Sequence, residues 1–189
     1  MSRDAIRQQF KSYCDARPVG GKFSYRKTDG PAGSSPSMKW VNPPVAFMMH
    51  AGLPRLLDAC VTLPGLYTPN QEKKHFTRIA LEAYPGLLAR ELIGNKSYKS
   101  DEKTKQTPER LIARKQILQA LEEGQTRLRL RLKRTNAQHE ALVADSSGDT
   151  LDSVLCMVQV AWAQVERAKG HGCYGLPEFD SLEGWIVTA

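Results

Sequence analysis

The chain has 189 residues, of which 41% are hydrophobic and 25% are charged. This composition, with a mean hydropathy of −0.45, is typical of one globular domain and excludes a collagen-like fibre or a disordered tail protein. The 27 lysines and arginines outnumber the 20 aspartates and glutamates, so the net charge of +7 favours association with polyanions such as nucleic acid.

In the N-terminal part, helical spacing of apolar residues predicts an amphipathic helix from Asp4 to Arg17, with Ser2 as its N-cap. Residues 17–45 form a long basic loop rich in glycine and proline, and a mostly apolar helix follows over residues 43–60. Aromatic side chains lie between the cations of the loop: Phe23, Tyr25 and Trp40. Such side chains could stack on bases and hold phosphates, although packing of the aromatics against the body explains them equally well.

The next segment predicts the first part of a sheet. The apolar run Ile79–Leu81 is typical of a strand buried on both faces, with Glu82 at its C-terminal end. A helix over residues 86–93 follows directly, which is a step typical of α/β architecture. We therefore expect a strand–helix core over residues 76–189.

Two further patterns follow a polar, lysine-rich loop. Thr107-Pro108-Glu109 predicts the start of a helix that ends near Gly124. Arginine and leucine alternate strictly over residues 127–132, which predicts a half-exposed strand, with a short basic helix as the alternative. The arginine face would suit phosphate groups, but a charged strand edge that prevents aggregation also explains it, and we favour the edge interpretation.

The clearest helical periodicity follows residues 146–148. Apolar residues between positions 151 and 165 predict a helix with a full apolar stripe. A second strip, at steps of three or four residues, consists of Asp149, Asp152, Cys156 and Val160. Because the apolar half of this strip is expected to be buried, its two aspartates are expected to face protein or a cleft. Residues 183–187 predict a short final strand.

The acidic residues Glu82, Asp149 and Asp152 are candidates for a carboxylate cluster. Carboxylate oxygens are preferred ligands of Mg2+, and paired metal ions can activate water and stabilise the leaving oxygen in phosphodiester cleavage. The structural alternatives are a capping box of Ser146 with Asp149 and an ion pair of Glu82 with a nearby cation. The histidine spacing predicts no zinc site, and the sequence contains neither a glycine-rich phosphate loop nor a nucleophile elbow.

Several motifs stand in the order seen in one protein family. They are Arg26-Lys27-Thr28-Asp29, Glu82-Ala83-Tyr84-Pro85, Tyr98-Lys99, Gly148-Asp149-Thr150-Leu151-Asp152 and Glu183-Gly184-Trp185-Ile186. Over residues 17–186 the chain resembles the group called domain of unknown function 429, regarded as predicted nucleases with a ribonuclease H-like fold. The resemblance implies an α/β fold in which helices flank a mixed sheet.

The resemblance also implies the roles of individual residues. Glu82, Asp149 and Asp152 would be the catalytic residues and the ligands of Mg2+ or Mn2+. Arg26 and Lys99 would bind the phosphates of the substrate.

The chain departs from this family pattern at its start. A ribonuclease H-like core opens with strands, the first of which carries an essential aspartate, and no such strand precedes Arg17. We therefore expect a helix-rich fold truncated at the N-terminus, either as the C-terminal piece of a longer protein or as a form that has lost part of the site. A sheet that lacks strands would expose an edge, so we expect a second copy or another partner to cover it.

These observations lead to one expected function and one alternative. We expect a metal-dependent, nuclease-like single domain over residues 1–189 that hydrolyses DNA or RNA, inactive if the missing strand is essential. The alternative is a non-catalytic basic module that binds nucleic acid or protein. No apolar run approaches the roughly 18–20 residues that span a bilayer. Cys60 and Cys156 lie in apolar segments, as buried thiols do in a reducing compartment, so we expect a cytoplasmic protein without membrane contact.

Overall fold

The computed structural model describes residues 2–19, 24–36, 39, 45–69 and 78–189. The chain divides into two compact units, Met1–Leu81 with Phe179–Trp185, and Glu82–Glu178 with Ile186–Ala189. Phe23 and Trp40 of the predicted loop, and residues 76–77 of the predicted strand, lie outside the described residues. No described helix is long and apolar enough to cross a membrane.

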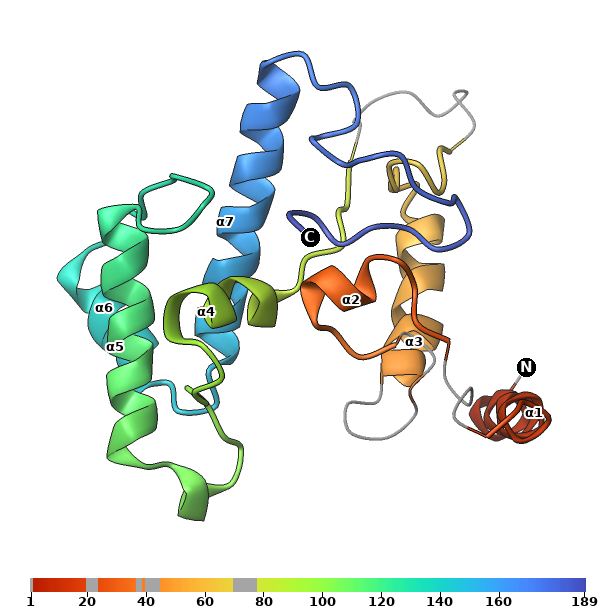
Figure 1. The fold of residues 1–189 in the computed structure, drawn as a ribbon, viewed down its shortest axis with the longest axis horizontal. Coiled ribbons are helices and arrows are strands. Elements are labelled where there is room, and N and C mark those ends of the chain that lie inside the picture. The colour runs from red at the N-terminus through yellow and green to blue at the C-terminus, as the bar shows by residue number, and fades with distance from the viewer. Residues whose placement is uncertain (1, 20–23, 37–38, 40–44, 70–77) are drawn as a thin grey trace. The chain divides into compact units, whose positions relative to one another are not determined.

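The first unit contains the helices α1 (Arg3–Asp15), α2 (Asp29–Ala32) and α3 (Val45–Asp58) (Figure 1). The predicted start of α1 is confirmed, because the Ser2 hydroxyl accepts a hydrogen bond from the Ala5 backbone N–H at 3.2 Å. The predicted helix over residues 43–60 is confirmed as α3, although none of its residues is buried.

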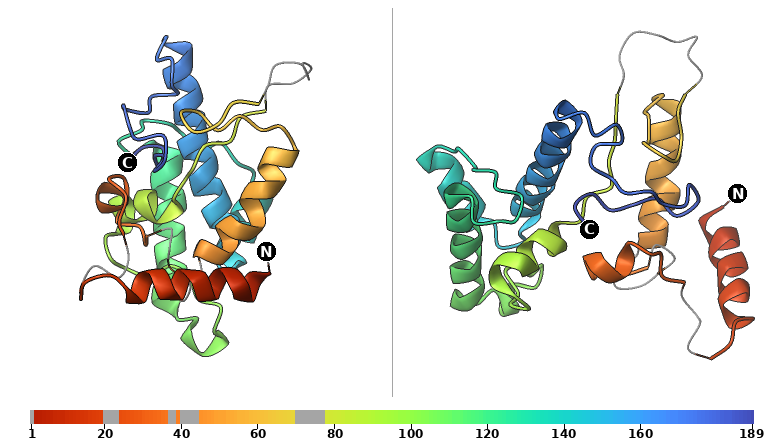
Figure 2. Two further views of the ribbon diagram at one scale, coloured as in Figure 1. Left: turned by 90° about the vertical axis from the view of Figure 1, so that its right-hand side faces the viewer. Right: turned by 45° about the horizontal axis from the view of Figure 1, so that its top comes forward.

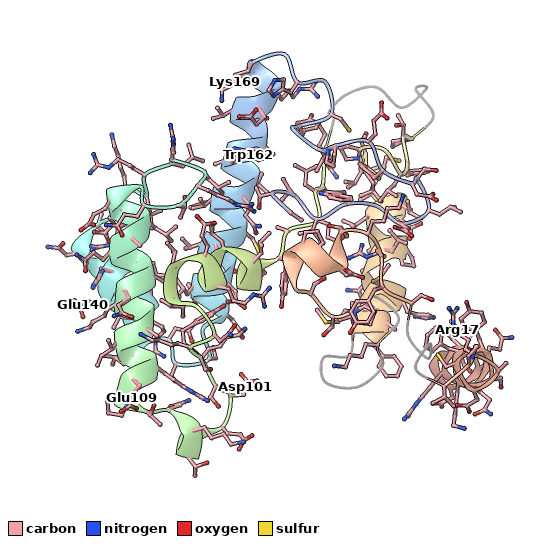
Figure 3. The ribbon with its side chains drawn as sticks, in the orientation of Figure 1. Arg17, Asp101, Glu109, Glu140, Trp162 and Lys169 are labelled. Atoms are coloured by element: carbon pink, nitrogen blue, oxygen red, sulfur yellow. The ribbon has the colours of Figure 1, made fainter. Side chains whose placement is uncertain are left out.

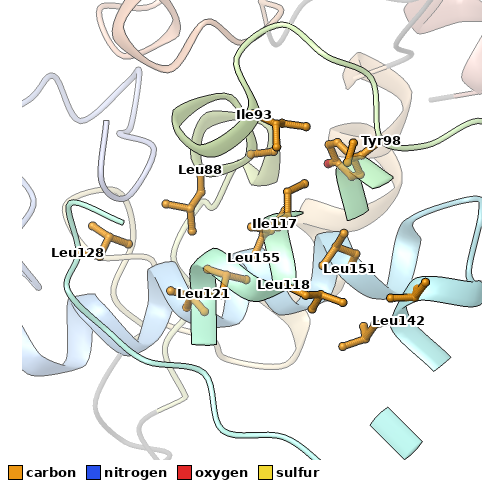
Figure 4. Close-up of a cluster of buried hydrophobic side chains, with 14 residues drawn as sticks. Leu88, Ile93, Tyr98, Ile117, Leu118, Leu121, Leu128, Leu142, Leu151 and Leu155 are labelled. Carbon is orange, nitrogen blue, oxygen red and sulfur yellow. The ribbon is translucent and has the colours of Figure 1, made fainter. Parts of the chain in front are cut away.

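The second unit contains α4 (Pro85–Ile93), the short 3-10 helix η1 (Lys103–Lys105), α5 (Pro108–Glu123), α6 (Asn136–Ala144) and α7 (Asp149–Ala168). α4 packs against both α5 and α7, and α6 packs against α5 (Figure 2). Buried apolar side chains join these four helices in one core (Figure 4), including Leu88, Ile93, Ile117, Leu118, Leu121, Leu142, Leu151 and Leu155. Burial of these side chains is the main source of the unit's stability.

The helix ends follow local chemistry, with one exception. α5 begins after Thr107 and ends at Gly124 in the left-handed conformation, as predicted. The predicted capping box of Ser146 is wrong, because α7 instead begins at Gly148 with φ at 74°. The Asp145 carboxylate binds this helix start, and its Oδ2 accepts the Thr150 N–H at 2.9 Å.

The apolar stripe predicted on α7 is confirmed, with Leu151, Leu155 and Val158 buried. Trp162, further along the helix, is partly buried and packs against the core (Figure 3). The apolar half of the second strip is only partly buried, because Cys156 is half-buried and Val160 is 44% exposed. The main packing face of α7 is therefore the first stripe.

The predicted ribonuclease H-like mixed sheet is wrong, because the described residues form helices and isolated β-bridges but no sheet. The predicted strand around Ile79 contributes two parallel bridges, Thr62 with Ile79 and Glu82 with Ile186. Ile79 is 37% exposed, so this run is not buried on both faces. A short apolar run has the same pattern in a strand and in an irregular segment. In this part of the chain there is thus no sheet edge for a partner to cover.

Residues 127–132 also form no strand among the described residues, yet their side chains alternate as predicted. Leu128 is buried, and Leu130 and Leu132 pack against the core, while the arginines between them are exposed. The alternation therefore reflects burial of every second side chain against helices, not a β-ladder. Since no ladder forms here, protection of a strand edge no longer explains the arginines.

The packing of α7 predicts the effect of two matched substitutions. Leu155 is 0% exposed and Met157, two residues further along, is 53% exposed. We expect Leu155→Ala to lower the free energy of unfolding by about 3–5 kcal/mol, because it leaves a cavity. Met157→Ala should lower it by less than about 1 kcal/mol. Chemical denaturation followed by circular dichroism measures both, and equal losses would contradict this packing.

Candidate functional site

A compact polar cluster surrounds Asp152 in the first turn of α7. The Asp152 side chain is 20% exposed. Its Oδ1 accepts a hydrogen bond from the Tyr98 hydroxyl at 2.5 Å, and its Oδ2 accepts one from Lys99 Nζ at 2.5 Å. Asp149 Oδ1 lies 4.0 Å from Lys99 Nζ on an 80% exposed side chain. The structure thus brings together three residues predicted for the site: Lys99, Asp149 and Asp152.

Local structure fixes Lys99 in this cluster. The Lys99 side chain lies against Gly148, where an added Cβ would be 2.6 Å from Lys99 Cβ, so only glycine fits there. The buried Arg114 guanidinium donates to the Tyr98 carbonyl at 2.8 Å and to the Val143 carbonyl at 2.9 Å. The residue before Lys99 is thereby tied to α5, and Lys99 itself to the start of α7.

The protonation states of the cluster follow from burial and from the Asp152 charge. Burial of Tyr98, together with its hydrogen bond to Asp152, raises the pKa of the phenol far above its usual range. Burial alone would lower the pKa of Lys99, but the hydrogen bond and charge of Asp152 raise it above its ordinary value. Burial, then the Asp152 charge, also raises the pKa of the Cys156 thiol. Tyr98 and Lys99 are therefore protonated at neutral pH and donate hydrogen bonds to Asp152, and Cys156 is a neutral thiol.

Glu82 does not join Asp149 and Asp152. The Glu82 side chain is exposed, and its carbonyl accepts the Val187 backbone N–H at 2.8 Å. No three His, Cys, Asp or Glu side chains of the described residues gather closely enough to hold a metal ion. Because Tyr98 and Lys99 also occupy both oxygens of Asp152, the three acids do not fit a Mg2+ or Mn2+ centre in this arrangement.

Arg26, predicted to bind phosphate, lies in the first unit and is held there by Asp29. Arg26 Nη2 donates to Asp29 Oδ1 at 2.9 Å, and the Arg26 backbone N–H donates to Oδ2 at 2.9 Å. Its Nη1 donates to the Glu183 carbonyl at 3.2 Å. The Arg26 side chain is 13% exposed and that of Asp29 is 0% exposed. Arg26 thus has a structural role, and its position does not favour phosphate contact.

The cations of residues 127–133 differ in how far the protein already uses them. Arg127 donates to the Thr188 carbonyl, and its Nε lies 3.4 Å from Glu91 Oε2. Arg131 Nε donates to the Glu122 carbonyl at 2.9 Å. The side chains of Arg129 and Lys133 are exposed and have no ion-pair or hydrogen-bond partner within the described part of the chain.

Two residues that fix the candidate site were not predicted from the sequence. The Asp145 carboxylate accepts the backbone N–H of Thr150, five residues further along. Arg114 donates to the carbonyls of Tyr98 and Val143, which are distant in sequence. A signal existed only for Arg114, which interrupts the apolar face of α5 as a buried cation. Buried cations require hydrogen-bond acceptors, but the sequence does not say which carbonyls supply them.

The Arg26–Asp29 pair predicts a pH dependence for the first unit. Burial alone would raise the pKa of Asp29, but the donors of Arg26 and Ser34 lower it below its ordinary value of 3.8. The folded unit therefore binds the Asp29 proton less tightly than the unfolded chain does. The contribution of the pair to the free energy of unfolding is complete above the ordinary pKa of Asp29 and is lost as the pH falls below it. We expect Asp29→Asn to cost about 3 kcal/mol at pH 7. Thermal unfolding between pH 2 and pH 7 tests this, and a variant that keeps the full acid dependence would contradict it.

The close approach of Lys99 to Gly148 predicts a second effect on stability. Gly148→Ala must adopt φ near 74° and displace the Lys99 side chain. Gly170 provides a matched control, because it has φ at 95° but no heavy atom within 4 Å of an added Cβ. Left-handed backbone costs a non-glycine residue about 1 kcal/mol, so Gly148→Ala should destabilise the protein by more than Gly170→Ala does. Chemical denaturation of both variants measures the difference, and equal effects would argue against the contact.

The comparisons with known proteins add no family and no function to this geometry. No protein-family model, no curated protein and no solved structure matches the chain. The resemblance to the predicted nucleases therefore stays a prediction from the motifs alone, and the function must be argued from the structure.

Proposed function

We propose that this protein is a non-catalytic module that binds nucleic acid through the exposed cations of residues 127–133. One observation carries the proposal: the leucines of this segment are anchored in the core while its cations face outward. The anchoring supports the proposal because a cationic surface that is ordered beforehand loses little conformational entropy when it binds phosphate groups.

The charges of the segment also support phosphate binding. Arg129 and Lys133 have no acidic partner within the described residues, so their charges are available to a ligand. Arg127 and Arg131 extend the cationic face on either side of Arg129. Such contacts neutralise backbone phosphates and release counterions, which gives affinity without base specificity.

Metal-dependent hydrolysis, which the sequence led us to expect, has weaker support. Asp152 is bound by Tyr98 and Lys99, and Glu82 does not gather with the other two acids. Binding of Mg2+ or Mn2+ stays a prediction, as does cleavage of DNA or RNA.

Fluorescence anisotropy with labelled single-stranded and double-stranded oligonucleotides tests the proposal. We expect Arg129→Gln with Lys133→Gln to weaken binding and to reduce the salt slope of the logarithm of the affinity by about 2. The matched control, Lys103→Gln with Lys115→Gln, removes the same charge from exposed positions of the same unit and should retain most of the affinity.

Three outcomes would contradict the proposal. The first is the absence of binding at low salt, and the second is an equal loss of affinity in the control. The third is metal-dependent cleavage that Asp152→Asn abolishes, which would favour the nuclease expected from the sequence.

A further inference from the structure

A cavity of about 340 Å3 opens between α4 and the loop that follows it. This volume lies at the small end of the range of about 300–1,000 Å3 that is typical of ligand sites. α4 lines it with Gly86, Ala89 and Arg90, and residues 94–99 line the rest. All of these residues belong to the second unit.

The charged residues that line the cavity are all cations. Arg90, Lys96 and Lys99 line it, and no carboxylate is among the lining residues. Lys96 is exposed and has no ion-pair partner within the described residues. Positive groups that converge on one concave surface focus the field and attract an anion.

Two of the three cations are held in place. Lys99 Nζ is bound to Asp152 Oδ2 at 2.5 Å, and its stem rests on Gly148. The Arg90 guanidinium carbon lies 5.4 Å from the centre of the Tyr84 ring, within the distance of a cation–π contact. The cavity is thus largely formed before a ligand arrives, which limits the entropy lost on binding.

The backbone of the loop adds neutral donors. Within the described part of the chain, no acceptor takes the backbone N–H groups of residues 95–99. Backbone N–H groups and lysines together are the usual partners of phosphate oxygens. Ala89 and the buried ring of Tyr98 supply an apolar part of the wall.

We propose that this cavity binds a small phosphate monoester, with its phosphate on Lys96, Lys99 and Arg90 and a small apolar group against Ala89 and Tyr98. The anionic phosphate matches a wall whose charged residues are Arg90, Lys96 and Lys99, of which Lys99 already pairs with Asp152. The proposal does not rest on nucleic-acid binding by residues 127–133, because no residue of that segment lines the cavity.

Isothermal titration calorimetry of the full chain at low ionic strength tests it with three probes: phenyl phosphate, inorganic phosphate and phenol. We expect saturable binding of phenyl phosphate, weaker binding of inorganic phosphate and none of phenol. Lys96→Gln should weaken binding of phenyl phosphate about fivefold or more, because it removes a charge from the wall. Amide chemical shifts should move most in residues 94–99.

The control is Lys103→Gln, which removes the same charge from an exposed residue of η1 outside the cavity. It should leave the affinity for phenyl phosphate unchanged, as should Arg129→Gln with Lys133→Gln. An unchanged affinity in Lys96→Gln, an equal loss in the Lys103 control, or no binding of phenyl phosphate would overturn the proposal. Circular dichroism of each variant shows that the fold is retained.

Discussion

The burial of α4 between α5 and α7 is the constraint on which the second unit depends. α4 contacts both helices and places Leu88 and Ile93 in their common core. One face of this short helix is therefore used for packing, while Arg90 remains at the wall of the cavity. Because α4 ends at Gly94, the loop that carries Lys96 and Lys99 starts from a fixed point on the core.

Polar contacts then fix that loop. Arg114 reaches from the core to the Tyr98 carbonyl, and Asp152 accepts both Tyr98 and Lys99. A half-buried carboxylate needs compensation for lost hydration, and these two donors supply it. The same bonds that make Asp152 a good anchor for Lys99 make it a poor ligand for a metal ion. Asp152, which the sequence predicted to be catalytic, holds the Lys99 ammonium group in this structure.

Much of the helical structure could be predicted from the sequence, and the errors share one physical cause. Helix starts such as Ser2 and Pro108 depend on groups within one turn, so local patterns predicted them. The sheet was predicted wrongly, because apolar runs and strict alternation indicate which side chains are buried and not which elements bury them. Residues 128, 130 and 132 are turned inward as expected, but helices cover them instead of neighbouring strands.

For the candidate site, the sequence by itself determined the excess of positive charge, the apolar stripe of α7 and the placement of Asp149 and Asp152 in its first turn. These follow from composition and helical period. Only the tertiary structure decided that Lys99 binds Asp152, that Glu82 stands apart from both aspartates and that Arg26 is held by Asp29. The reason is physical: a carboxylate binds whichever donor the packing of the chain brings within about 3 Å, and no local pattern specifies that donor.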